Sequence, residues 1–256
     1  NDAQLPRNRI FRHRVQAGKG NGASKDSHKR PENTKRELFS SIFAAKISAK
    51  LTSKKIYVVR HGQTDFNLRN IVQGSGVDSD LNDRGREQAQ AFYRMYKQIP
   101  FDKVYTSALR RTRQSVQSFI DDGIPAESLA GLNEISWGNK EGFSITPDED
   151  EYYHYMLRQW QLGDTSLRIE GGESPDDVVR RMQPAIDQIM SQPDETTVLV
   201  CMHGRAIRIL LCLLLRYPMR CMDSFEHENL CLYQLHFNGS FFTVEKHNDT
   251  AHLRLS

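Results

Sequence analysis

Two short apolar runs, far apart in the chain, each end in a His-Gly step. Ile56–Val59 comes shortly before His61-Gly62, and Thr197–Met202 comes directly before His203-Gly204. Short runs rich in β-branched residues and followed by polar ones are typical of buried parallel strands. Because open α/β sheets bind ligands outside the carboxyl ends of their strands, we expect both histidines at one ligand-binding edge.

The segments between these runs show helical spacing of apolar residues and further short strands. Helices are predicted at Leu81–Lys97, Ala108–Ile120, Glu149–Leu162, Ser174–Met190 and Ala206–Leu215. Further strands are predicted at Lys103–Thr106 and in a closing hairpin, Leu230–His236 with Phe241–Lys246, around Asn238-Gly239. Strands that alternate with helices predict a three-layer α/β/α domain with a mainly parallel central sheet.

Basic residues are concentrated at the start of the chain. Residues 1–55 hold 14 Lys and Arg against 4 Asp and Glu, whereas the 256-residue chain holds 35 against 32. The remainder is therefore acidic and repels phosphate backbones on average, which argues against nucleic-acid binding. Large apolar side chains are sparse before Leu38, so we predict a basic, disordered leader at 1–54 and one domain at 55–256.

The leader has three interpretations. Its basic, serine-containing and acid-poor composition resembles an organelle transit peptide. It could instead bind an anionic surface. The interpretation we favour is a solvated tail or upstream sequence without a role in the activity, and loss of activity on deletion of residues 1–50 would overturn it.

Cysteine spacing and the apolar runs indicate a soluble, cytoplasmic protein, with organelle targeting by the leader left open. The four cysteines, Cys201, Cys212, Cys221 and Cys231, form no C-x-x-C pair and suit a reducing compartment. The longest apolar run, Ile209–Leu215, is far too short to span a bilayer, and no secretory signal is visible.

Each His-Gly step carries a guanidinium beside it in sequence. Arg60 precedes His61, and Arg205 follows two residues after His203. Forked guanidinium donors suit a phosphate-like anion better than a lysine ammonium does. A lone histidine at a strand end is more often structural, but the repeated pattern favours an anion site between the two rings.

Six motifs in register resemble the histidine phosphatase superfamily, which includes the cofactor-dependent phosphoglycerate mutases. The resemblance covers about residues 55–246. Arg60 to Asn67 resembles the family's R-H-G-[EQ]-[ST]-x-x-N signature, and Val200 to Gly204 resembles its second histidine motif. The other matches are Leu81–Ala89, with Asn82 in place of a hydroxyl residue, Ser107–Arg111 (S-x-L-x-R), Leu132–Gly142 (L-x-E-x-x-x-G-x-x-E-G) and Gly171–Ser174 (G-G-E-S).

The resemblance implies a phosphoglycerate mutase-like fold and a phosphohistidine mechanism. It implies that His61 attacks phosphorus, with its other ring nitrogen held by a backbone acceptor in the Gly62 loop. It further implies that Glu134 protonates the leaving group, and we expect this carboxyl at the rim of the pocket, out of pairing distance from Arg60. The phosphate-binding residues implied are Arg60, Gly62, Asn67, Arg111, His203 and Gly204.

The resemblance requires neither a metal nor another cofactor, because Arg60, Arg111 and His203 already neutralise the phosphate. No cluster of His, Asp and Glu has ligand spacing either.

Two positions have competing interpretations. The S-x-L-x-R spacing from Ser107 indicates that Arg111 is the site residue. Because neighbouring residues on a helix face about 100° apart, Arg110 is expected at the surface. His227 lies between two acidic residues, and we expect it to be exposed rather than in the pocket.

For the activity, we favour a metal-independent phosphomonoesterase acting on a small phosphorylated metabolite. The first alternative is a cofactor-dependent phosphoglycerate mutase, which must keep water from its phosphohistidine. The predicted cover, made by Gly142–Gly171 and the residues after the last strand, looks short for that purpose. The second alternative is a non-catalytic phosphate-binding scaffold, which the intact set of site residues disfavours. Neither the substrate nor the oligomeric state can be read from the sequence.

Overall fold

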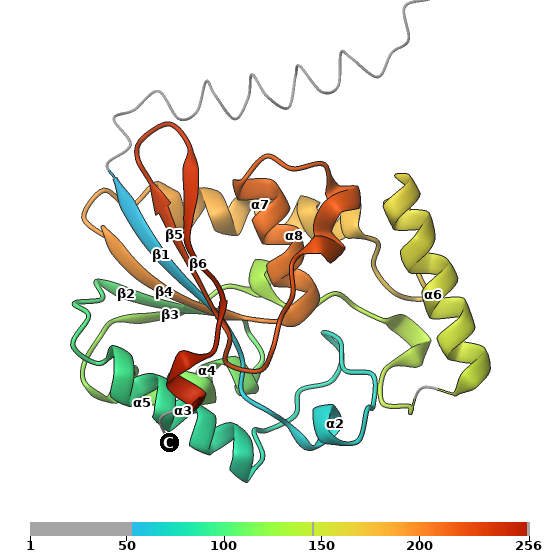
Figure 1. Cartoon of the computed structure of the whole chain (residues 1–256), viewed down its shortest axis with the longest axis horizontal. Helices are drawn as coiled ribbons and strands as arrows, with labels where there is room; N and C mark the ends of the chain where they lie inside the picture. The colour runs from blue at the N-terminus through green and yellow to red at the C-terminus, as the bar shows by residue number, and fades with distance from the viewer. Residues whose placement is uncertain (1–52, 145, 255–256) are drawn as a thin grey trace, which may run out of the picture. The chain divides into compact units, whose positions relative to one another are not determined.

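A computed structural model describes residues 53–144 and 146–254, so the predicted leader lies outside the described residues apart from its last two positions. The described chain forms one six-stranded sheet, shown in Figure 1. Its strands are β1 (Lys54–Arg60), β2 (Lys103–Thr106), β3 (Ala126–Ser128), β4 (Thr197–Met202), β5 (Leu232–Phe237) and β6 (Phe242–Asp249).

The sheet has the order β3-β2-β4-β1-β5-β6. β1, β2, β3 and β4 are parallel, and β5 and β6 add an antiparallel edge. β1 and β4 are neighbours in register, with Arg60 opposite Met202. The two His-Gly steps therefore leave the sheet side by side, which is what positions the site.

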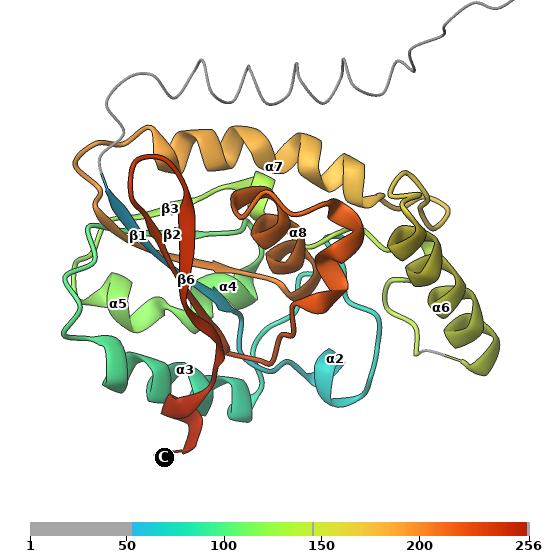
Figure 2. The ribbon, with the colours of Figure 1, turned by 45° about the horizontal axis from the view of Figure 1, so that its top comes forward.

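Helices cover both faces of the sheet (Figures 1 and 2). The α-helices are α2 (Asp65–Leu68), α3 (Asp83–Tyr96), α4 (Arg110–Ser115), α5 (Gln117–Asp121), α6 (Pro147–Leu162), α7 (Pro175–Met190) and α8 (Gly204–Leu214). Short 3-10 helices are η1 (Ala130–Leu132), η2 (Gly138–Lys140), η3 (Met219–Ser224) and η4 (Ala251–Arg254). The predicted three-layer α/β/α architecture is confirmed.

Each face of the sheet has its own apolar core, because neighbouring strand residues point to opposite sides. Ile56 and Val58 pack with α7 and α8, whereas Tyr57 and Val59 pack with α3 and α5. Beyond the carboxyl ends of the parallel strands lie α2 and α6 (Figures 1 and 2). The site is thus built on two rigid strands and bordered by these two helices.

Local sequence fixes where the main helices start. Asn82 caps α3 by accepting from Gly85 N at 2.9 Å, so the residue that replaces the family's hydroxyl keeps the capping role. Ser174 and Asp177 form a capping box at α7, with Pro175 in its first turn. The G-G-E-S match thereby marks a true helix start.

Several predicted boundaries differ from the structure. The helix expected at Ala108–Ile120 is broken at Val116, where φ is −123° and ψ is 13°, into α4 and α5. β6 continues to Asp249, so His247 belongs to the strand rather than to a tail. The 3-10 helix that follows packs against α3, where the His252 and Phe92 rings lie 5.2 Å apart.

Candidate active site

The structure brings the two sequence-distant histidines together. The rings of His61 and His203 have centroids 5.1 Å apart and an interplanar angle of 58°. His61 N donates to Met202 O at 3.0 Å, which ties the two strand ends to each other. Both side chains are buried, with exposures of 2% and 0%. The convergence expected from the two strand ends is therefore observed.

The hydrogen bond between His61 and the carbonyl of Gly62 determines which ring nitrogen carries the proton. Nδ1 lies 2.7 Å from Gly62 O, and a carbonyl oxygen only accepts, so Nδ1 carries the proton and Nε2 has a free lone pair. Burial, followed by the charges of Arg111 and Arg60, holds the pKa of His61 well below its ordinary value. The imidazole is thus neutral near pH 7 and nucleophilic at Nε2.

His203 is held at both ring nitrogens. Nε2 lies 2.8 Å from Ser107 Oγ, and Arg111 Nε donates to Nδ1 at 3.3 Å. Because a guanidinium only donates, the proton of the neutral ring sits on Nε2 and points at the serine. Burial, followed by Arg111 and His61, lowers the pKa of His203 well below its ordinary value.

Arg111 is fully buried beside these rings. Its Nη1 donates to Val77 O at 2.6 Å and its Nη2 to Gly74 O at 3.2 Å. Burial lowers the pKa of its guanidinium to about 10, which still leaves it charged at neutral pH. Among the described residues it forms hydrogen bonds to carbonyls but no ion pair, so its charge stays available for an anion.

Arg60 provides the second guanidinium. Its Nη1 lies 3.3 Å from His227 Nδ1, and its buried Nε has no hydrogen-bond partner among the described residues. His227, expected to be exposed, is instead half-buried, with burial and then Arg60 lowering its pKa to about 3. A Cβ added to Gly204 would lie 2.8 Å from the His227 ring, so a side chain at position 204 would push that ring away from its contact with Arg60.

Glu134 is buried, with an exposure of 7%. Its Oε1 accepts from Ile135 N at 3.0 Å and Ala206 N at 2.9 Å, and its Oε2 from Arg205 N at 3.1 Å. The carboxylate thus sits at the N-terminus of α8, where free amides and the helix dipole favour an anion. No ion pair with Arg60 is formed among the described residues, in agreement with the expectation.

The loop that follows His61 is supported by the motif at the start of α3. Gln63 N donates to Gln88 Oε1 at 2.9 Å. Cβ atoms added to Gly62 or Gly85 would lie 2.6 Å from Gly85 O and 2.1 Å from Gln63 O, respectively, so the two backbones touch. Asn67 accepts from Thr64 N at 3.2 Å, which places its side chain beside the same loop.

Two arginines lie outside the anion site. Arg110 is exposed and pairs with Asp78 and Asp80 at 3.0 and 3.2 Å, as expected. Arg205, expected beside His203 as an anion clamp, turns away instead. It pairs with Asp223, donates to Tyr153 Oη at 3.1 Å and lies 5.4 Å from the Trp160 ring centre. Arg111, not Arg205, supplies the guanidinium at His203.

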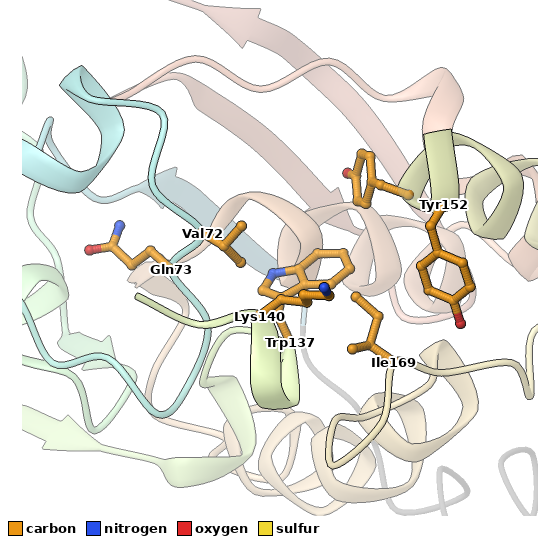
Figure 3. A pocket seen from close by; sticks show the side chains of 7 residues that line it. Val72, Gln73, Trp137, Lys140, Tyr152 and Ile169 are labelled. Carbon is orange, nitrogen blue, oxygen red and sulfur yellow. The ribbon is translucent and has the colours of Figure 1, made fainter. Parts of the chain in front are cut away.

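A cavity of about 180 Å³ is lined by segments that lead to or from the site residues in sequence. Figure 3 shows its lining side chains, which come from the segment after α2, from Trp137 and η2, from α6 and from the approach to α7. Among the described residues, no group of three or more His, Cys, Asp or Glu is placed to hold a metal ion. None of the helices in the described part of the chain is long and apolar enough to cross a membrane.

Residues 56–250 match the family model of the histidine phosphatase superfamily (branch 1). This chain belongs to that superfamily. The match covers most of the domain and contains His61, Glu134, His203 and both site arginines.

The proteins to which this chain is similar carry different descriptions. A Yersinia pestis protein described as "Probable phosphoglycerate mutase GpmB" is 29% identical over 208 residues, covering 78% of this chain and 94% of its own. The fold is shared with a putative α-ribazole-5'-phosphate phosphatase of Escherichia coli, which is 22% identical with a TM-score of 0.67. The superposition covers 77% of this chain and 97% of the other. The fold is also shared with a mycobacterial glucosyl-3-phosphoglycerate phosphatase, which is 24% identical with a TM-score of 0.66. Here the superposition covers 76% of this chain and 98% of the other.

Sequence reasoning missed several residues that hold this superfamily site together. Ser107 was part of a quoted motif, but its contact with His203 was not foreseen. Arg181 donates to Glu134 O at 2.9 Å and pairs with Glu173 at 2.7 Å, so the G-G-E-S glutamate supports the Glu134 loop. Asn229 Nδ2 donates to His61 O at 3.1 Å. The G-G-E-S match was the one sequence signal for this support.

Proposed function

We propose that this superfamily member is a metal-independent phosphomonoesterase that acts through a phosphohistidine on a small phosphorylated metabolite. One observation carries the proposal: a neutral imidazole with a free Nε2 faces a second imidazole, and the guanidiniums of Arg60 and Arg111 lie beside the pair. Neither guanidinium forms an ion pair with a carboxylate of the described residues. A cationic, largely buried space of this kind suits a phosphate dianion.

In the first half-reaction, His61 Nε2 forms a bond to phosphorus while the bond from phosphorus to the ester oxygen breaks. Arg60 and Arg111 stabilise the charge on the equatorial oxygens, with Asn67 and the backbone amide of Gly204 as neutral donors. The Gly62 amide, expected as a further donor, already donates to Ser115 Oγ at 2.9 Å.

When a phosphate oxygen displaces Arg111 Nε from His203 Nδ1, the neutral ring adopts its other tautomer. Nδ1–H then donates to the phosphate, and Nε2 accepts from the Ser107 hydroxyl.

Glu134 gives a proton to the departing alkoxide and later takes one from water, which attacks the phosphohistidine and restores His61. The three amides around its carboxylate stabilise the anion that remains after the first transfer. To carry the proton, Glu134 must release the longest of these contacts, the one to Arg205 N.

The test is phosphate release from p-nitrophenyl phosphate in the presence of EDTA. We expect turnover in the wild-type protein and none in His61→Ala. Brief reaction followed by alkaline denaturation should trap phosphate on the wild-type chain, and acid should release it, because phosphohistidine is labile in acid. No phosphate release from a broad panel of phosphomonoesters would favour the scaffold.

The likeness to a protein described as a phosphoglycerate mutase supports a second candidate, the mutase. A mutase interconverts 2- and 3-phosphoglycerate when primed with the bisphosphate and releases little phosphate. Equal rates of interconversion and hydrolysis, or faster interconversion, would favour it over the phosphatase.

A further inference from the structure

Three segments that line the cavity are linked to site residues. One follows a site residue by three positions in sequence, and the other two are hydrogen-bonded to residues two or three positions after a site histidine. Trp137 follows Glu134 by three positions. Gln73 Oε1 accepts from Thr64 Oγ1 at 3.3 Å, and Thr64 follows His61 by three positions. Tyr153 Oη accepts from Arg205, two positions after His203, at 3.1 Å. Gln73 also directly precedes Gly74, whose carbonyl accepts from Arg111 Nη2 at 3.2 Å. These links place the cavity wall on the same segments that hold the site residues.

The wall of this cavity is apolar and aromatic. Val72, Ile169 and the ring of Trp137 line it together with the rings of Tyr152 and Tyr153 (Figure 3). Lys140 is the one charged residue among its described lining residues. Arg205, the nearest other cation, is already paired with Asp223. A substrate rich in anionic groups beyond its phosphate would find few partners there.

The ring of Tyr153 is held by aromatic packing and by the hydrogen bond from Arg205. Trp137 and Tyr153 pack edge to face with centroids 5.5 Å apart, and Trp137 lies 6.2 Å from Trp160. Aromatic pairs at these distances hold a preformed wall. Such a wall binds a flat apolar group without a large ordering cost.

The volume limits the size of the group. Apolar protein cavities of roughly 150 Å³ accommodate benzene. The cavity here, about 180 Å³, is therefore large enough for one aromatic ring or a branched chain of similar size.

We propose that this cavity is the leaving-group subsite and that the substrate is a phosphomonoester of an alcohol bearing a single aromatic or equally compact apolar group. This inference rests on the proposed phosphatase function, since it concerns the group that His61 would displace. It separates the chain from an enzyme of phosphoglycerate, whose leaving group carries a carboxylate.

The activity test compares 2-phenylethyl phosphate with glycerol 1-phosphate, since both release a primary alkoxide and differ mainly in the group bound. We expect kcat/KM to be at least about 30-fold higher for the phenylethyl ester, as burial of one ring predicts. His61-dependent cleavage of p-nitrophenyl phosphate with no preference between these two esters would overturn the subsite and leave the phosphatase standing.

Variants locate the effect in the cavity. Tyr152→Ala should raise KM for 2-phenylethyl phosphate by about fivefold and leave glycerol 1-phosphate unchanged. Leu162→Ala, which removes an exposed apolar side chain from the same helix outside the cavity, should change neither. Lys140→Met should preserve or improve kcat/KM for 2-phenylethyl phosphate, because its leaving group has no charge for Lys140 to bind. A large loss of kcat/KM for this neutral-tailed ester would show that Lys140 binds the phosphate itself and would contradict an apolar leaving-group subsite.

A binding measurement keeps the inference testable without turnover. By calorimetry, 3-phenylpropylphosphonate should bind the wild-type protein at least about tenfold more tightly than 3-hydroxypropylphosphonate, and Tyr152→Ala should remove most of the difference. Equal affinities would overturn the subsite even if no ester is hydrolysed. A preference for the phenyl compound in an inactive protein would instead support the subsite and count against the phosphatase alone.

Discussion

At the scale of single residues, the site depends on how each charged group is held. Arg111 and Arg110 are neighbours on α4, yet one is fully buried against carbonyls and the other is exposed and paired with aspartates. Their difference arises from helix geometry, because consecutive residues face about 100° apart. The pair is a matched test of the phosphate-binding role proposed for Arg111.

Arg111→Lys should lower kcat for p-nitrophenyl phosphate by about 10²–10³-fold. A lysine keeps the charge but cannot donate to Gly74 O, Val77 O and His203 at once. Arg110→Lys should stay within about twofold of the wild-type rate, because exposed ion pairs contribute little. Equal losses in the two variants would contradict the assignment of Arg111.

The proton-transfer role proposed for Glu134 predicts a dependence on the leaving group. Glu134→Gln should slow hydrolysis of an alkyl phosphate by about 10²–10⁴-fold, because an alkoxide needs a proton in order to leave. The loss with p-nitrophenyl phosphate should be at least tenfold smaller, since nitrophenolate leaves without one. Steady-state kinetics on both esters measure the ratio, and equal losses would point to a structural role at α8.

At the scale of elements, the sequence allowed the strands and the main helices to be predicted because their patterns are local. The strands at 103–106 and 197–202 were predicted with their observed boundaries. β3 was missed because its three residues, Ala126–Ser128, carry no apolar alternation. The break at Val116 was missed because nothing in the apolar spacing marks it.

The candidate site was predictable to the extent that backbone position determines it. His61 and His203 had to meet once β1 and β4 paired in parallel. The direction of Arg205 and the burial of His227 depend on Asp223, Tyr153 and Arg60, which come from other elements. Such contacts are set by tertiary packing, which spacing along one chain segment does not encode.

The segment before α3 makes a prediction at this scale, because it supplies the carbonyls that hold Arg111. A Cβ on Gly74 would lie 2.7 Å from Ile135 O and 2.2 Å from Glu141 Oε1. Gly74→Ala should therefore destabilise the fold by about 1–3 kcal/mol and reduce activity, since the Gly74 carbonyl must shift.

Gly76→Ala is the matched control. Its Cβ would meet only the flexible carboxylate end of Glu141, at 2.6 Å, so we expect a smaller loss in stability. Urea unfolding and p-nitrophenyl phosphate kinetics measure both effects. A larger loss at Gly76 than at Gly74 would show that the backbone contact with Ile135 does not fix this segment.

At the scale of the whole molecule, three buried or half-buried histidines are kept neutral within a cationic site. Burial is the main cause of the lowered pKa of His61, His203 and His227. In the unfolded chain these rings titrate near 6.5. Below that pH the unfolded chain binds protons that the folded chain does not, so acid favours unfolding.

The free energy of unfolding should therefore fall as the pH is lowered from 7 to 5, at constant salt. Burial lowers the pKa of His227 to about 3. The stability that its neutral ring contributes is therefore fully present above pH 6.5 and is lost steadily as the pH falls from 6.5 toward 3. His227→Gln should reduce the slope by up to about 1.4 kcal/mol per pH unit. Urea unfolding at pH 8 gives the packing cost of the substitution, because the histidine is neutral there in both states. Subtraction of that cost leaves the part of the stability change that depends on proton binding. If the slope of the variant equals that of the wild type, His227 takes up its proton in the folded protein as readily as in the unfolded chain.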